Sequence, residues 1–282
     1  MGPLRVGLVG IENSHVDHIL RHLHESDAPP LRVSAMVAGE PERTRALAAG
    51  GRVERVVDDV RELHGEVDAL IVATRDGATH RALAVPFLRA GIPVWVDKPL
   101  ATTVDDADAI LAAAEAGGAL LTSSSTLRWA PDTVAVAAAL PSLGPLRSVT
   151  VSGPADEGSP YGGLFFTGIH LADIAQRLVP GAPEGVEVVD RDHGFAARYR
   201  VGDVAVTLDI VRPRDDVPYR VSVSGAEGGV DREIVVGADY VRPGLRAFAD
   251  MLATGVAPVP AAEMRAAVAV LAEVERVRHP GR

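Results

Sequence analysis

The chain has 282 residues, 47% of them hydrophobic and 23% charged, and its formal net charge at pH 7 is −10. This length is enough to bury a substantial core in one large domain or in two of moderate size. The acidic balance argues against a nucleic-acid binder, the absence of cysteine excludes disulfides and thiolate chemistry, and no apolar run approaches the ~20 residues that span a membrane.

The first part of the chain alternates apolar runs with amphipathic segments. Residues 68–74 (DALIVAT) form the clearest strand, because the run is continuous, rich in β-branched residues and bounded by polar ones. Asn13 or Ser14 is expected to cap the first helix, and Gly91 to end a later one. The expected strands are 4–10, 31–37, 53–57, 68–74, 93–97 and 119–122, and the expected helices are 14–24, one from residue 41, 79–90 and 104–116. This alternation predicts a Rossmann-type doubly wound parallel sheet.

The rhythm changes after about Thr122, where short strands follow one another with Gly, Asp and Pro between them. Such spacing predicts a mostly antiparallel sheet. The expected strands are 146–151, 186–189, 196–201, 205–211, 219–223 and 233–236, and the expected helices are 165–178, 243–253 and 261–277. We therefore expect two domains, a dinucleotide-binding domain at 1–122 and an α+β domain for substrate binding and oligomerisation at 123–282.

Lys98 is the only lysine of the chain, whose other basic residues are arginines. A lysine ammonium loses its proton when it is desolvated, which an arginine guanidinium does not do. Lys98 follows the expected strand 93–97, and ligands of parallel sheets bind beyond the carboxyl ends of the strands. A functional lysine is therefore the first interpretation, and a surface lysine at a strand end is the alternative.

Two motifs together resemble those of a known family. Residues 91–100 (GIPVWVDKPL) run a strand into an acidic-Lys-Pro turn, and residues 168–173 (GIHLAD) follow downstream. In this order the pair is similar to the turn and helix of the glucose–fructose oxidoreductase/inositol dehydrogenase (Gfo/Idh/MocA) family, and the resemblance extends over essentially the whole chain. It implies hydride transfer between NAD or NADP and an alcohol carbon of a sugar, polyol or related small molecule.

The resemblance also implies roles for single residues. Lys98 would stabilise the alkoxide-like oxygen that develops during the reaction, and His170, as an imidazole with an unperturbed pKa near ~6.5, would transfer the proton. A packed histidine on a helix face is the alternative interpretation of His170. Asp173 would orient the helix that carries His170. The expected substrate-binding residues are Lys98, Arg128, Trp129, Phe166, His170 and Asp173.

Three positions depart from the family's pattern. The turn at residues 10–15 (GIENSH) keeps only the first glycine of G-x-G-x-x-G, and Glu12 brings a carboxylate where a diphosphate would lie. Coulomb repulsion opposes binding there unless Glu12 turns away. The second strand ends at Ala38 without the usual ribose-binding acid. Phe166 stands four residues before His170, where the family has an aspartate.

We expect the cofactor to be held at the ends of the first strands, with the helix N-terminus as an anion site. The expected cofactor-binding residues are Gly10, Glu12, Asn13, Ser14, Ala38, Thr74, His80 and Asp97. A capping or packing role is the alternative for His80. His15, His18 and His22 share one helix face, but carboxylates are few nearby, so we expect no metal site.

The departures keep a second hypothesis open, a protein that retains the fold but acts as a non-redox ligand-binding or regulatory module. A lyase- or hydrolase-type reaction is a third, and no residue selects it. A serine hydrolase is not expected, because Ser123–Ser125 lacks the flanking glycines of a nucleophile elbow.

The expected partners are a small-molecule substrate and further copies of the chain, as a homodimer or larger homo-oligomer, with neither nucleic acid nor membrane. The N-terminus has no basic segment before a long apolar stretch, so we expect no signal peptide and a cytoplasmic protein.

Overall fold

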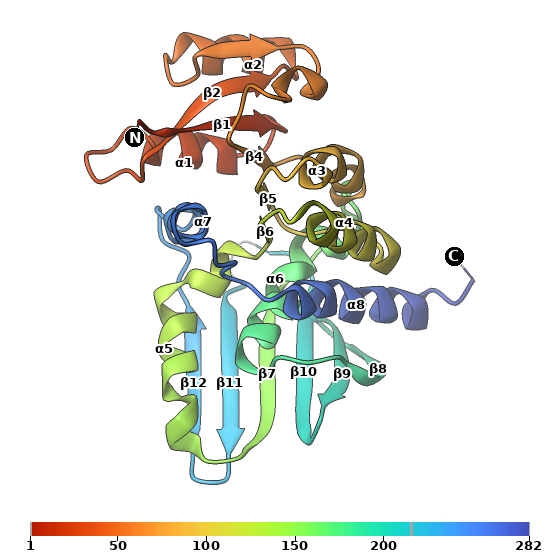
Figure 1. The fold of residues 1–282 in the computed structure, drawn as a ribbon. Coiled ribbons are helices and arrows are strands. Elements are labelled where there is room, and N and C mark those ends of the chain that lie inside the picture. Colours follow the sequence, from red (N-terminus) through yellow and green to blue (C-terminus); the bar gives the residue numbers. More distant parts are fainter. Residues whose placement is uncertain (1, 215–216, 282) are drawn as a thin grey trace. The chain divides into compact units, whose positions relative to one another are not determined.

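The computed structural model of the protein describes residues 2–214 and 217–281 (Figure 1). The chain forms two compact units, each assembled from more than one stretch of sequence. The first unit comprises Met1–Ala101, Asp105–Ser123 and Val241–Val259, and the second comprises Thr102–Val104, Ser124–Tyr240 and Pro260–Arg282. Within the described ranges, no helix has the length and apolar character needed to cross a membrane.

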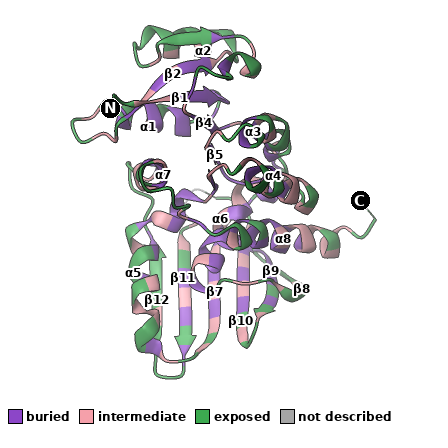
Figure 2. Cartoon of the chain, in the orientation of Figure 1, coloured by how far each residue is buried: buried purple, intermediate pink, exposed green. Residues whose placement is uncertain are grey.

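The first unit is built on a six-stranded sheet in the order β3-β2-β1-β4-β5-β6, in which every neighbouring pair is parallel. Its strands are β1 (Leu4–Val9), β2 (Leu31–Val37), β3 (Arg55–Val57), β4 (Ala69–Val72), β5 (Val94–Val96) and β6 (Leu121–Thr122). All residues of β4 and β5 are buried, as expected for the central strands of a parallel sheet (Figure 2). The predicted doubly wound parallel sheet is confirmed.

The helices of this unit connect its strands, except for the last one, which comes from a later stretch of the chain. They are α1 (His15–His22), α2 (Pro41–Ala49), α3 (His80–Arg89), α4 (Val104–Gly117) and α7 (Arg242–Thr254), with short 3-10 turns at Val60–Leu63 and Gly77–Thr79. The division expected from the sequence assigned α7 to the second domain, whereas the structure groups it with the first unit. The reason is packing: the ring of Phe248 on α7 lies 5.6 Å from that of Trp95, and Arg242 forms an ion pair with Asp27.

The second unit contains a six-stranded sheet in the order β12-β11-β7-β10-β9-β8. Its strands are β7 (Leu146–Pro154), β8 (Glu184–Arg191), β9 (Gly194–Val201), β10 (Val204–Val211), β11 (Tyr219–Gly225) and β12 (Gly229–Ile234). Neighbouring strands are antiparallel except for the central pair of β7 and β10. That pair is parallel because the chain leaves β7 through a helix and returns beside it only after β8 and β9. The predicted mostly antiparallel sheet is confirmed.

Three helices pack on this second sheet: α5 (Pro131–Ala139), α6 (Phe165–Leu178) and α8 (Ala261–Arg278), with 3-10 turns at Thr126–Trp129 and Leu140–Leu143. Most residues of α6 are buried, between the sheet and α8 (Figure 2). A helix that is enclosed in this way holds its side chains in fixed positions, which suits a helix that carries reactive groups.

Candidate active site

The turn between β1 and α1 lies where the strand order of the first sheet reverses. β1 pairs with β2 on one side and with β4 on the other, and ligands of such sheets bind at this switch point, beyond the carboxyl ends of the strands. Gly10 opens the turn with φ of 93°, and a Cβ there would lie 2.2 Å from the Thr74 amide nitrogen. Only glycine permits this close approach of the turn to the end of β4.

A buried polar network ties the same turn to the end of β5. Asp97, which is 2% exposed, accepts a hydrogen bond of 2.8 Å from the side-chain amide of Asn13. The Nδ1 atom of His15 lies 2.9 Å from the same carboxylate, and the Asn13 side-chain oxygen accepts a bond of 3.0 Å from the His15 amide. Burial alone would raise the pKa of Asp97, but the charge and hydrogen bond of His15 outweigh it and hold the pKa well below its ordinary value.

Lys98 lies directly after Asp97 and is 7% exposed. Burial lowers the pKa of its ammonium group below the ordinary value, against the opposing charge of Asp97. His80 fixes the turn that carries Lys98, because its Nδ1 lies 2.8 Å from the Pro99 carbonyl oxygen and its Nε2 lies 3.0 Å from that of Thr74. The Lys98-Pro99 turn is therefore clamped to the end of β4 by a wholly buried side chain.

The carboxylate of Glu12 lies at the end of β2. Its Oε1 accepts a hydrogen bond of 2.9 Å from the backbone amide of Glu40, just before α2. The side chain is thus turned away from the N-terminus of α1, where a diphosphate is expected. Arg43 is held elsewhere, since its guanidinium binds both carboxylate oxygens of Asp17 at 2.8 and 2.6 Å and the Ile11 carbonyl at 2.9 Å.

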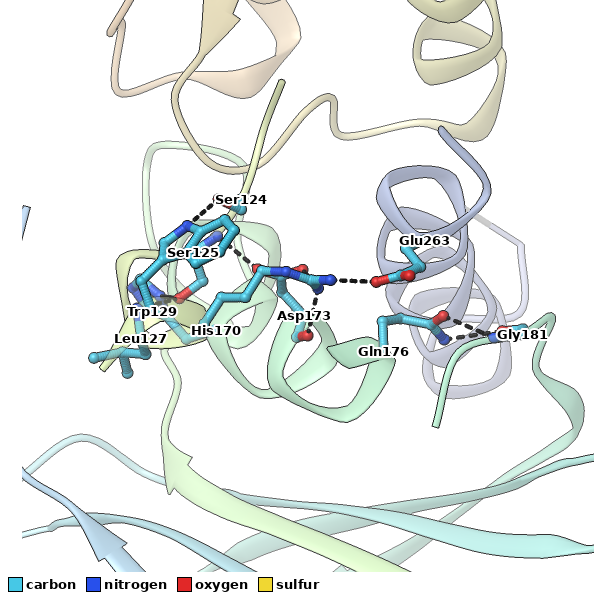
Figure 3. A network of polar contacts seen from close by, with 10 residues as sticks. Ser124, Ser125, Leu127, Trp129, His170, Asp173, Gln176, Gly181 and Glu263 are labelled. Carbon is cyan, nitrogen blue, oxygen red and sulfur yellow. Dashed lines mark hydrogen bonds and ion pairs between the residues drawn. The ribbon is translucent and has the colours of Figure 1, made fainter. Parts of the chain in front are cut away.

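His170 is the centre of a second polar network, in the second unit (Figure 3). Its Nδ1 lies 2.6 Å from the Ser125 hydroxyl oxygen, which also accepts a bond of 3.0 Å from the Leu127 amide. The Ser125 amide in turn donates to Asp173 at 2.7 Å. Asp173 lies one turn after His170 on α6, so it fixes the segment that holds the imidazole. The orienting role of Asp173 stays a prediction.

Arg128 is paired inside the protein. Its guanidinium, 4% exposed, donates to Asp173 at 2.9 Å and forms an ion pair with Glu263 of α8. Burial would lower the pKa of Arg128, but the two carboxylates hold it above its ordinary value. The neighbouring Trp129 donates from its indole to Ser124 at 2.9 Å. These contacts support a positioning role for Arg128. The substrate contact expected from the sequence stays a prediction.

This network makes a stability prediction. Replacing Arg128 with methionine leaves the buried Asp173 and the partly buried Glu263 without their hydrogen-bonded cation, and Arg177 is the charge that remains near them. We therefore expect a loss of about 3–5 kcal/mol in unfolding free energy. Arg276→Met is the matched control, because Arg276 pairs with Glu273 at the surface of α8 and such pairs contribute about 0–1 kcal/mol. Chemical denaturation of both variants tests this, and equal losses would contradict the structural role of the network.

A pocket of about 520 Å³ lies in the second unit beside β7 and the start of α6. Its walls are mostly aromatic rings and prolines, and its polar groups are few. The lining residues are Pro154, Asp156, Ser159, Pro160, Tyr161, Phe166, Thr167, Pro213, Arg214 and Tyr219. Phe166 thus serves as a wall of the pocket, where its ring lies 5.2 Å from that of Tyr161.

Tyr219 connects this pocket to His170. Its ring packs flat over Gly153, where a Cβ would lie 2.4 Å from a ring carbon, and it meets the His170 ring edge-on at 5.8 Å. Burial raises the pKa of the Tyr219 hydroxyl to about 12, so at neutral pH it keeps its proton and can donate a hydrogen bond. Sequence reasoning missed Ser125 and Tyr219, because nothing in their spacing relates them to His170.

The histidines of α1 have partners within the helix region. His22 lies 3.1 Å from a Glu25 oxygen, and His18 lies 3.0 Å from an Arg21 nitrogen. Among the described residues, no group of three or more His, Asp or Glu side chains is placed to hold a metal ion.

The chain is similar to known proteins, most clearly in its N-terminal part. Residues 4–125 match the GFO_IDH_MocA family, described as "Oxidoreductase family, NAD-binding Rossmann fold". Inositol 2-dehydrogenase 2 of Paenarthrobacter aurescens is 34% identical over 143 residues, which are 48% of this chain and 41% of that protein. Inositol 2-dehydrogenase of Rhizobium meliloti is 26% identical over 276 residues, which cover 87% of this chain and 82% of its own. The match to the first of these relatives thus spans about two fifths of its length.

The fold is also shared with solved structures. GenD2 from gentamicin A biosynthesis, in complex with NAD, superposes with a TM-score of 0.83 at 21% identity, over 100% of this chain and 96% of its own. At this identity the likeness concerns the fold.

The edge of the first sheet fits a dinucleotide in three respects. Gly10 keeps the turn close to β4, the side chain of Ser14 just before α1 caps no helix amide, and the Glu12 carboxylate is directed to the end of β2. The amide of His15 is the exception among the first helix amides, because it donates to the Asn13 side chain. His15 occupies the position of the third glycine of the motif, and its imidazole is bound to Asp97. The residues needed to hold such a cofactor are therefore present, although the glycine motif is incomplete.

Proposed function

We propose that this chain, whose residues 4–125 match the GFO_IDH_MocA oxidoreductase family, is an NAD(P)-dependent oxidoreductase of an alcohol carbon in a sugar, polyol or related small molecule. The observation that carries the proposal is Lys98, the only lysine, buried beyond β5 and fixed by the His80 clamp. The Asp97 carboxylate opposes the effect of burial on this ammonium, and ligands of parallel sheets bind beyond the carboxyl ends of the strands, where Lys98 lies.

The reaction oxidises a C–OH carbon to a carbonyl, so the carbon loses a hydride and the hydroxyl loses a proton. The bound cofactor supplies the hydride acceptor. In the proposal, His170 takes the hydroxyl proton at Nε2, because Ser125 holds the Nδ1 side of the ring. Lys98 stabilises the negative charge that develops on the oxygen. Gly10, Asn13, Ser14, Ala38 and Thr74 would border the cofactor, with His80 and Asp97 keeping the Lys98 turn in place.

The lining of the pocket in the second unit is suited to binding a cyclic substrate. The C–H face of a sugar or cyclitol ring can pack on the rings of Tyr161 and Phe166, while Asp156, Arg214 and the Tyr219 hydroxyl offer hydrogen bonds to its hydroxyls. In this proposal Phe166 contributes packing where the family has a carboxylate, and proton transfer depends on His170 alone.

This role of Phe166 makes a prediction. Phe166→Leu keeps the side chain apolar but removes the ring, so KM for the best cyclic substrate should rise about three- to tenfold with kcat within about twofold, since aromatic contacts contribute ~0.5–1.5 kcal/mol. Steady-state kinetics measure it. An open-chain polyol is the control, because it has no ring face to lose, and an equal rise in KM for both substrates would contradict stacking.

Binding and turnover together test the proposed function. Calorimetric titration with NADH and NADPH should give binding in the micromolar range, after any nucleotide that co-purifies has been removed. Oxidation of cyclitols and sugars, followed by NADH formation, should then depend on Lys98. Failure of both cofactors to bind would favour the second candidate, a non-redox ligand-binding protein, which the incomplete glycine motif and Phe166 support.

Assembly and location are part of the proposal. Along β7, β10 and β11 buried residues alternate with more exposed ones (Figure 2). The buried ones are mostly apolar and the others include Thr150, Thr207 and Ser222, so one face of this sheet is polar. We propose that this face mediates a homodimer or larger homo-oligomer, which light scattering coupled to size exclusion tests. The expected cytoplasmic location stays a prediction.

A further inference from the structure

We propose that Glu12 is the residue that binds the adenosine ribose and selects NAD over NADP, in place of an acid on β2. The inference rests on the proposed function. In Rossmann folds an Asp or Glu at the end of the second strand accepts hydrogen bonds from the ribose hydroxyls. In this chain β2 is followed by Ala38 and Gly39, and neither carries a carboxylate.

The structure supplies a carboxylate there from another segment. Glu12 belongs to the β1–α1 turn, yet its Oε1 accepts a hydrogen bond of 2.9 Å from the Glu40 amide, two residues beyond Ala38. That bond anchors one carboxylate oxygen. A carboxylate has about four lone-pair sites, so an anchored one retains acceptor capacity for ribose hydroxyls.

Gly39 makes room for this arrangement. A Cβ on Gly39 would lie 2.0 Å from Glu12 Oε1 and 2.9 Å from a side-chain carbon of Ile11. The backbone of Gly39 does not have a positive φ, so the need for glycine comes from the side chain of Glu12 rather than from the turn. The loss of an acid on β2 and the presence of glycine beside it are therefore explained by one feature, the Glu12 carboxylate.

Arg43 is attracted to the Glu12 carboxylate, but its hydrogen bonds go to other groups. Arg43 is the candidate for binding a 2′-phosphate, but both terminal nitrogens of its guanidinium donate to Asp17. This pairing raises the pKa of Arg43. Glu40 caps α2 by accepting bonds from the amides of Glu42 and Arg43. A 2′-phosphate would therefore meet the Glu12 carboxylate without a cation dedicated to it, and like-charge contact of this kind rejects a ligand.

Titration of the full chain with NADH and NADPH tests the inference. Wild-type protein should bind NADH at least about tenfold more tightly than NADPH. Glu12→Gln keeps the shape of the side chain but removes its charge. It should weaken the binding of NADH about 10- to 100-fold, as loss of a hydrogen bond to a charged group does, and it should strengthen the binding of NADPH. Gly39→Ala, which displaces the carboxylate without removing it, should shift the preference in the same direction. Glu42→Gln, on an exposed neighbour, is the control and should change neither affinity.

The outcomes separate this inference from the proposed function. If NADH binds and Glu12→Gln leaves the NADH-to-NADPH ratio unchanged, Glu12 is not the selecting residue, although the oxidoreductase proposal stands. If Glu12→Gln binds NADH more tightly than the wild type does, Glu12 obstructs the site and the inference is wrong. If neither cofactor binds to the wild type or to the variants, the proposed function fails and the inference fails with it.

Discussion

Replacing Lys98 with methionine should lower kcat for alcohol oxidation by about 10²- to 10³-fold, the loss that follows removal of one group stabilising an oxyanion. Methionine has a similar length and apolar stem, so the buried side chain keeps most of its packing. NADH affinity should change little, because the dinucleotide is assigned to the β1–α1 turn and the end of β2. The measurement is steady-state kinetics beside calorimetric binding of NADH.

The pH profile distinguishes a catalytic ammonium from a structural one. Burial lowers the pKa of Lys98, so its ammonium loses its proton at a lower pH than an exposed lysine does. If the charged form is the active one, kcat falls as pH rises through this lowered pKa. Lys98→Arg should restore part of the activity and flatten the alkaline limb, because a guanidinium keeps its proton throughout this range.

A lower kcat in Lys98→Met must be distinguished from the effects of unfolding and of losing a positive charge. Removing Lys98 also removes a charge next to Asp97, so a denaturation curve must show that the Lys98→Met variant is folded. Arg89→Met, an exposed substitution at the end of α3 in the same unit, reports the effect of losing a distant positive charge. A folded Lys98→Met protein that keeps more than about a tenth of the wild-type kcat would overturn the proposed role.

The fold was largely predictable from the sequence, because its signals are local. Continuous β-branched runs such as DALIVAT become the buried strands of the parallel sheet, and closely spaced alternating runs become the second sheet. The α5 helix (Pro131–Ala139) was missed since its Ala- and Val-rich sequence carries little amphipathic contrast. The place of α7 was missed because its packing against Trp95 joins residues that are far apart in the chain.

The candidate site was predictable in its reactive groups but not in their supports. Lys98 stood out by its residue type and His170 by its motif. The Ser125 hydroxyl lies 45 residues before His170 in the chain, and no sequence period links the two positions. The sequence left open whether the Glu12 carboxylate faces the expected diphosphate site or turns away from it, and the structure places it at the Glu40 amide. Side-chain direction depends on the tertiary environment, which a linear pattern does not contain.

His170 is the site of the second large expected effect. His170→Asn keeps a polar side chain but cannot accept a proton at neutral pH, so kcat should fall by about 10²- to 10⁴-fold, the usual contribution of a positioned acid–base group. Ser125→Ala should give a smaller loss, because the imidazole remains and only its hydrogen-bonded support at Nδ1 is removed. Steady-state kinetics over a range of pH measure both.

The two variants should differ in more than magnitude. If Ser125 acts by positioning His170, Ser125→Ala moves the acid limb of the pH profile, whereas His170→Asn removes that limb. Ser125→Thr, which keeps the hydroxyl, should recover part of the activity. Ser142→Ala is a matched control, because the exposed Ser142 hydroxyl donates to the Ala139 carbonyl at 2.7 Å. An unchanged pH profile in folded Ser125→Ala would mean that Ser125 only packs. An unchanged kcat in folded His170→Asn would mean that a group other than His170 accepts the proton.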